Sequence, residues 1–137
     1  MHMKNYLCRG KTLPIDEYDE SMWTVGYYVC FNGVEHRIYS GYAETDCGDY
    51  YPDWDGVIPK TVGRYTEMED KHHERIFEGD IIYRDWFGGR TYQVTYDNIF
   101  GAFIGVAANG TFTTFDGDSD SFEIIGNIHD NPELMGN

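Results

Sequence analysis

The chain has 137 residues, of which 24 are acidic and 10 are basic, so its formal net charge is −14. Aromatic residues make up 17% of the chain and hydrophobic residues 41%, a composition that excludes a disordered acidic tail, because such tails lack aromatic residues. No apolar run of about 18 residues is present and the first residues, MHMKNY, lack an apolar signal core, so we expect neither a membrane span nor secretion.

The first half of the chain predicts one strong β-hairpin. Apolar residues alternate from Met22 to Phe31, and a second strand-like run extends from Val34 to Ala43, with Asn32-Gly33 between the two. Asn-Gly predicts a two-residue type I′ turn, because that turn needs a positive φ at both positions. The turn fixes the register and creates an apolar face that we expect to be core. The expected pairs are Phe31–Val34, Val29–His36, Tyr27–Ile38 and Trp23–Tyr42.

Short strands are also expected in the second half, after a loop. The segment from Tyr50 to Lys60 contains two prolines and shows no strand or helix period, which predicts a loop or linker. Gly88-Gly89 predicts a second tight hairpin, in which Phe87 pairs with Arg90. About seven strands and no convincing helix result, a pattern typical of a β-sandwich or small barrel. The second-half strands are expected over residues 81–87, 90–96, 100–108, 111–115 and 122–128.

Two separated motifs stand out in the second half. The first reads Val62-Gly63-Arg64-Tyr65-Thr66, then Asp70-Lys71, then Ile76-Phe77-Glu78-Gly79-Asp80-Ile81. The second, over residues 123–134, reads EIIGNIHDNPEL. Together they resemble the YopX protein family, whose patterns are approximately QYTGLKDKNGKEIYEGDIV and EVIGNIYENPEL. The resemblance covers about residues 57–135, whereas residues 1–50 share only the general style of an early strand pair.

The resemblance implies a fold and a phage or prophage origin, but no catalytic activity. YopX-like proteins are small phage and prophage products whose C-terminal part looks like an SH3-type β-barrel, and the resemblance also implies homo-oligomers. The family has no established activity, so no catalytic residue is implied here. The chain departs from the family pattern in two loops. Glu67-Met68 replaces the Gly-Leu of the pattern, and His72-His73 replaces its Asn-Gly. Residues that match the motifs are interpreted as turn residues: Tyr65, Thr66, Glu78, Gly79, Asp80, Gly126, Asn127, Asn131 and Pro132.

Three acidic or histidine-containing clusters could hold a metal, and each has a simpler interpretation. Glu78-Gly79-Asp80 fits a carboxylate pair, but a turn is favoured because Gly frees the backbone and Asp bonds nearby amides. Adjacent histidines in His72-His73 point apart on an extended chain, which favours a solvated loop. The run from Asp116 to Asp120 begins like a calcium loop, but its sixth and twelfth positions are not the required Gly and Glu. A polar connector is therefore favoured.

The chain has three cysteines, an odd number, and none of them form a CxxC pair: they are Cys8, Cys30 and Cys47. A closed structural zinc site uses four ligands at short paired spacings, so these cysteines do not predict one. Reduced thiols in a cytoplasmic protein fit best.

Aromatic and acidic residues are interleaved just before the second half. They form either an interaction surface, since Tyr and Trp anchor interfaces, or a lid over the barrel. As candidate partner-binding residues we take Tyr50, Tyr51, Asp53, Trp54 and Asp55.

The sequence therefore predicts the all-β class, a protein that is mainly β. An N-terminal β-hairpin region and loop (residues 1–57) would pack on an SH3-like β-barrel (residues 58–137). We expect a cytoplasmic, phage- or prophage-encoded, non-catalytic binding or assembly protein with no cofactor and no metal. It would dock a host or phage protein through an acidic aromatic surface, form a homo-oligomer and bind no membrane. Ten scattered basic residues disfavour nucleic acid. Open alternatives are an acidic nucleic-acid mimic that inhibits a host DNA-acting enzyme, a single-strand nucleic-acid-binding barrel, and a metal-dependent enzyme.

Overall fold

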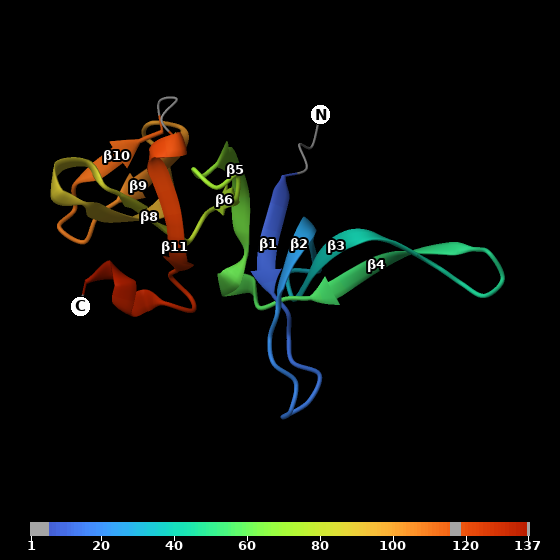
Figure 1. Cartoon of the computed structure of the whole chain (residues 1–137). Coiled ribbons are helices and arrows are strands. Elements are labelled where there is room, and N and C mark those ends of the chain that lie inside the picture. The colour runs from blue at the N-terminus through green and yellow to red at the C-terminus, as the bar shows by residue number, and fades with distance from the viewer. Residues whose placement is uncertain (1–5, 116–118, 137) are drawn as a thin grey trace. The chain divides into compact units, whose positions relative to one another are not determined.

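The computed structural model describes residues 6–115 and 119–136, and the chain forms two compact units, Met1–Arg64 and Tyr65–Asn137 (Figure 1). The described residues contain eleven strands and four short 3₁₀ turns. All strand pairs are antiparallel, which confirms the prediction of a mainly β protein. Among the described residues, no helix is long and apolar enough to cross a membrane.

The first unit is built on a four-stranded meander with the order β4-β3-β2-β1. The start of β5 (Gly63–Glu69) continues this sheet, because Gly63 and Arg64 pair with β1. The 3₁₀ turn η1 (Pro59–Thr61) is fastened to β1, since the Thr61 hydroxyl accepts a hydrogen bond from the Lys11 amide at 2.9 Å. Residues 58–64 therefore lie in the first unit. The meander strands are β1 (Leu7–Lys11), β2 (Trp23–Phe31), β3 (Glu35–Glu44) and β4 (Tyr50–Gly56).

The core of the first unit lies on one side of this sheet. Cys8 on β1, Ile38 on β3 and Val57 after β4 are buried, and Ile38 is fully enclosed. β2 and β3 approach closely at Gly26, where a Cβ atom would lie 2.2 Å from the Tyr39 carbonyl oxygen. Only glycine fits there, so Gly26 permits the close contact that covers Ile38.

The β2–β3 hairpin forms as predicted, but its predicted register is wrong by one residue. Val34 joins Asn32 and Gly33 in the turn, so Phe31 pairs with Glu35, Val29 with Arg37 and Tyr27 with Tyr39. A one-residue slip moves every side chain of one strand to the other face of the sheet. The β2 face predicted to be core is consequently exposed at Val25, Tyr27, Val29 and Phe31.

The second unit contains a five-stranded sheet of order β10-β9-β8-β7-β11, together with β6 (Arg75–Phe77) paired to β5. Its core gathers Ile76, Ile82, Tyr92, Val94 and Phe122. The SH3-like barrel is not confirmed, because neither sheet closes on itself within the described residues. The five strands are β7 (Asp80–Arg84), β8 (Arg90–Asp97), β9 (Ala102–Val106), β10 (Phe112–Thr114) and β11 (Phe122–Asn127).

The Gly88-Gly89 hairpin is looser than predicted. β7 ends at Arg84, which pairs with Arg90, and the 3₁₀ turn η2 (Trp86–Gly88) fills the connection. The predicted pair of Phe87 with Arg90 is wrong, because Phe87 has a positive φ of 55° and lies in the turn. A last 3₁₀ turn, η4 (Pro132–Met135), follows β11.

Candidate binding surface

The predicted partner-binding residues lie on a strand, so the loop prediction for this segment is wrong. β4 pairs with β3 from Tyr50–Glu44 to Gly56–Arg37, and Pro52 is accommodated because β4 is the last strand of the meander. Side chains alternate across a strand, which separates the five residues. Tyr50 and Trp54 belong to one face, whereas the opposite face takes Tyr51, Asp53 and Asp55.

Trp54 is the centre of a stacked cluster. The Arg37 guanidinium lies over the Trp54 ring at 3.8 Å and over the Phe31 ring at 4.6 Å, measured from its central carbon to each ring centroid. Tyr39 packs beside Trp54 with a centroid distance of 6.3 Å. Arg37 also donates to the Glu35 carboxylate at 2.6 Å and to the Tyr39 hydroxyl at 3.0 Å. These hydrogen bonds raise the pKa of Arg37, with the Tyr39 bond first, and hold its plane against the rings.

A second cluster lies at the other end of β2. Lys11 is directly opposite Trp23 in the β1–β2 register, and Arg9 is opposite Val25. The Arg9 guanidinium lies 4.7 Å from the Trp23 ring centroid, and the Lys11 ammonium lies 5.7 Å from it. Two cations therefore share one indole ring.

Between these clusters, Tyr27 occupies the middle of the exposed face with half of its surface accessible. Residues directly opposite each other in an antiparallel sheet share a face, so the registers join both clusters through Tyr27 and Tyr39. We call this surface the aromatic face. It comprises Leu7, Arg9, Lys11, Trp23, Val25, Tyr27, Val29, Phe31, Glu35, Arg37, Tyr39 and Trp54.

The aromatic face carries charged side chains of both signs. It holds three basic residues, Arg9, Lys11 and Arg37, and the acidic Glu35, which is directly opposite Phe31. The Glu35 carboxylate forms a salt bridge with Arg37. The two acidic members of the predicted set, Asp53 and Asp55, alternate to the opposite face. The predicted acidic aromatic surface is thus divided, with Tyr50 and Trp54 on one face of β4 and Tyr51, Asp53 and Asp55 on the other.

Two cavities of the first unit meet at Trp54. One, of about 600 Å³, is lined by apolar residues that include Leu13, Val34 and Pro59. The other, of about 570 Å³, reaches along the segment after β1 and includes Trp23 and Glu20. Trp54 forms part of the wall of both cavities.

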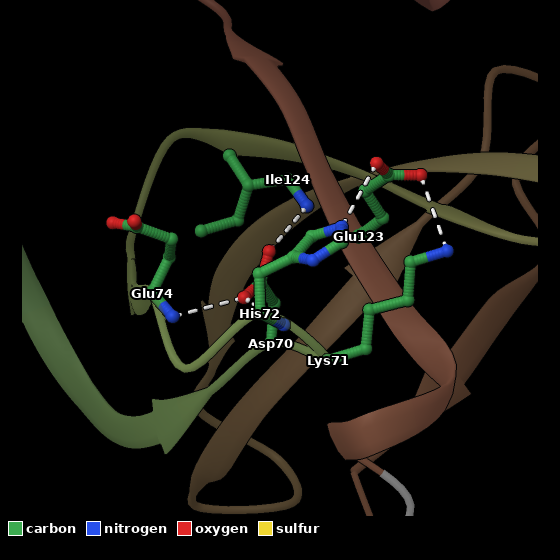
Figure 2. A network of polar contacts seen from close by, with 6 residues as sticks. All are labelled: Asp70, Lys71, His72, Glu74, Glu123 and Ile124. Carbon is green, nitrogen blue, oxygen red and sulfur yellow. Dashed lines mark hydrogen bonds and ion pairs between the residues drawn. The ribbon is translucent and has the colours of Figure 1, made fainter.

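In the second unit, the buried Asp70 side chain connects two segments by hydrogen bonds. One of its carboxylate oxygens accepts hydrogen bonds from the amides of His72 and Glu74 at 2.9 Å each, and the other accepts from the Ile124 amide at 3.0 Å (Figure 2). Burial raises the pKa of Asp70, but the hydrogen bonds from Ile124, Glu74 and His72 outweigh burial, and the pKa is lowered. Asp70 therefore fastens the β5–β6 turn to β11.

A salt-bridge pair extends this connection at the surface. Glu123 on β11 lies 3.2 Å from the His72 imidazole and 3.4 Å from the Lys71 ammonium, and the bonds from His72 and Lys71 lower its pKa (Figure 2). His73 adopts a positive φ of 64°, so the turn forms without the Asn-Gly of the family pattern. His72 therefore contributes to a structural connection, and no sequence signal indicated its partner Glu123.

The motif residues of the second unit lie at turns and close contacts. The Thr66 hydroxyl donates to the Ile76 carbonyl at 2.7 Å, and the buried Asp80 carboxylate accepts from the Phe77 amide at 2.8 Å. Gly79 has a φ of 90° beside Glu78, and Tyr65 packs on Phe77. At the C-terminal motif the side-chain oxygen Oδ1 of Asn127 accepts hydrogen bonds from the backbone amides of His129 and Asp130. The side chain of Asn131, before Pro132, lies where a Cβ on Gly126 would approach it to 2.6 Å.

Within the described residues, no group of three or more His, Cys, Asp or Glu side chains could hold a metal ion. The start of the calcium-like run, Asp116–Asp118, lies outside these residues. None of Cys8, Cys30 and Cys47, all within the described part, forms a disulfide.

A family model described as "YopX protein" matches residues 15–136. The chain belongs to the YopX family. The match confirms the resemblance found in the second half and extends it into the first unit, so the YopX model also spans β2, β3 and β4, which carry most of the aromatic face. No curated protein matches the chain.

Proposed function

We propose that this YopX family chain is a non-catalytic binding protein whose docking surface is the aromatic face. The observation that carries the proposal is that Val25, Tyr27, Val29, Phe31 and Trp54 all stay exposed on one face of the first unit. Large contiguous apolar patches on protein surfaces mark interaction sites. Trp, Tyr and Arg are also the residues that contribute most to binding energy in interfaces.

The surface is organised in advance of binding. Arg37 is fixed by Glu35 and Tyr39 and stacked between two rings, so little side-chain freedom remains to be lost when a ligand arrives. Fixing a surface in its bound geometry raises affinity by lowering that entropy cost. Trp54 is the member of the predicted set that this arrangement supports most directly.

The remaining parts of the proposal have separate support. The polar residues Asp70, Thr66 and Asp80 bond to backbone groups, which favours structural roles over catalysis. Family membership supports a phage or prophage origin. The cysteines without disulfides fit action in the reducing cytoplasm of a host cell. The last strand of the meander, β4, offers a route to self-association, because an edge strand presents unpaired backbone groups.

The test compares two tryptophan variants of the full chain. Trp54→Ala removes the centre of the aromatic face, and Trp86→Ala removes a tryptophan of similar exposure in the second unit. Host-cell lysate is passed over the immobilised wild type and both variants, and retained proteins and nucleic acids are quantified. We expect Trp54→Ala to lose the retained material and Trp86→Ala to keep it. Equal retention by Trp54→Ala and the wild type would contradict the proposal.

A further inference from the structure

We propose that the two cavities beside Trp54 bind a basic peptide segment of a partner protein, with a Lys or Arg side chain in one and an apolar side chain in the other. The inference rests on the proposed function, because Trp54 belongs both to the aromatic face and to the walls of the two cavities. It adds a class of partner, which the exposed rings of the aromatic face do not specify.

The cavity of about 570 Å³ is acidic, and we call it the acidic cavity. It is lined by the loop after β1 and by the last three residues of β4, and its lining includes Asp19, Glu20 and Asp55. Asp19 accepts a hydrogen bond from the Ile15 amide at 2.8 Å. Among the described residues, neither Glu20 nor Asp55 forms a salt bridge. A cation in this cavity would therefore give these two carboxylates a charge partner.

The basic side chains of the aromatic face do not occupy this site. They already lie over the rings of Trp23 and Trp54, so we assign the recognition of a cation to the carboxylates and not to the ring faces. Of the described residues that line the two cavities, none is Lys or Arg; this excludes Arg9, Lys11 and Arg37. The formal net charge of −14 also attracts a basic partner to the chain.

The cavity of about 600 Å³ is mainly apolar, and we call it the apolar cavity. The acidic residue in its lining, Glu35, forms a salt bridge with Arg37, so its charge is compensated. Burial of an apolar side chain here is favourable, because it removes apolar surface from water on both sides. Both cavities fall within the range of about 300–1,000 Å³ typical of ligand sites. The apolar residues of the lining are Leu13, Val34, Trp54, Val57 and Pro59.

The two cavities are neighbours, because Leu13, Trp54 and Gly56 line both. A peptide in which a basic residue is close to an apolar one can therefore fill both cavities at once. A small cation would fill only the acidic cavity, and a nucleic acid would bring its phosphates against carboxylates. Of these ligands, a basic peptide uses the most of the site.

The experiment measures the fluorescence anisotropy of three labelled peptides mixed with the full chain. The first carries Leu-Lys pairs in a Gly-Ser background, the second carries Ser-Lys pairs, and the third carries Leu-Glu pairs. We expect the Leu-Lys peptide to bind, and to bind more weakly at an ionic strength of about 0.15 M than at about 0.01 M, because salt screens exposed charges. The Ser-Lys peptide should bind about tenfold more weakly, since it leaves the apolar cavity empty. The Leu-Glu peptide should not bind.

Two double variants separate the acidic cavity from the acidity of the whole chain. Glu20→Gln with Asp55→Asn removes two carboxylates from the lining. The control, Glu17→Gln with Asp53→Asn, removes the same charge from exposed positions of the same loop and strand that do not line the cavity. The first variant should weaken binding of the Leu-Lys peptide about fivefold, which corresponds to two exposed ion pairs. The control should bind close to the wild-type affinity.

A second pair of variants tests the apolar cavity. Val34→Ser removes an exposed apolar side chain from its lining, and Ile99→Ser removes an exposed apolar side chain from the second unit. Val34→Ser should weaken binding of the Leu-Lys peptide about threefold and leave binding of the Ser-Lys peptide unchanged. Ile99→Ser should change neither. Circular dichroism of each variant checks that it is folded.

Three results would overturn the inference. They are no anisotropy change with the Leu-Lys peptide at low ionic strength, equal affinities of the Leu-Lys and Ser-Lys peptides, or equal affinities of the two folded double variants. If one of these is found but Trp54→Ala still loses the material retained from lysate, the aromatic face binds a partner of another class and only this inference fails. If Trp54→Ala also retains that material, the proposed function fails as well.

Discussion

Arg37 lies with its guanidinium carbon 3.8 Å from the centroid of the Trp54 ring, so a cation from β3 covers an indole from the edge strand β4. The same guanidinium is hydrogen-bonded to Glu35 and Tyr39 on its own strand. Arg37 thereby determines how Trp54 is presented to a ligand. This relationship yields the first prediction.

Replacing Arg37 by Lys should loosen Trp54 without unfolding the chain. Lysine keeps the charge but lacks the planar group that stacks on the ring and bonds two partners at once. In a Trp23→Phe, Trp86→Phe background, we expect the Trp54 emission to shift to longer wavelength and iodide quenching to increase. The matched change Arg90→Lys, at an exposed position of the second unit, should leave the emission unchanged. Unaltered Trp54 emission in Arg37→Lys would show that the stack does not hold the ring.

Ile38→Ala should destabilise the first unit by about 2–5 kcal/mol, because it empties a fully enclosed position in the core. Urea denaturation followed by circular dichroism measures the loss. The same substitution at Ile99, which is 94% exposed, is the control and should cost less than about 0.5 kcal/mol. Similar effects at both positions would refute the assignment of Ile38 to the core.

Gly26→Ala should be among the most damaging small substitutions, because the added methyl group would lie 2.2 Å from the Tyr39 carbonyl oxygen. Such crowding costs about 1–3 kcal/mol or more. Gly41→Ala on β3 meets nothing within 4 Å and serves as the control. The midpoint of urea unfolding should fall for Gly26→Ala only, and an unchanged midpoint would mean that β2 and β3 do not approach closely there.

Asp70 should make the second unit acid-sensitive. Its pKa in the folded chain is lowered by backbone hydrogen bonds, so its contribution is complete above the ordinary carboxyl value of about 3.9 and is lost as the pH falls through the lower folded value. Asp70→Asn keeps one acceptor for His72 and Glu74 but turns an amide donor toward the Ile124 amide. We expect a loss of about 2 kcal/mol at pH 7 and a flatter acid limb.

The control for Asp70 is Asp85→Asn. Asp85 is exposed and its side chain makes no capping hydrogen bond at η2, so its substitution should leave both stability and acid dependence unchanged. Denaturation curves collected between about pH 2 and pH 7 distinguish the two variants. An unchanged acid limb in Asp70→Asn would assign the sensitivity to another carboxylate.

The sequence predicted the strand-rich class and the β2–β3 hairpin, because alternation and Asn-Gly are local signals. It failed at the register, since whether Val34 belongs to the turn or to the strand depends on packing around Ile38 that no local pattern contains. It missed β4, because Pro52 and the irregular spacing there resemble a loop. Trp54 was chosen as a candidate binding residue by residue type, whereas Arg37, which stacks on its ring, was not singled out. The alternation of Arg37 with Tyr39 on one side of β3 was the signal that could have indicated it.

The sheet of the first unit is covered on the side of Cys8 and Ile38 and open on the side of Tyr27. A ligand that docks on the open side, as proposed above, would add a second layer to this sheet. A ligand that binds only the folded chain adds its binding free energy to folding, so the melting temperature of this unit becomes a measure of occupancy. Binding of a ligand to the first unit would then be measured as a rise in the melting temperature of that unit.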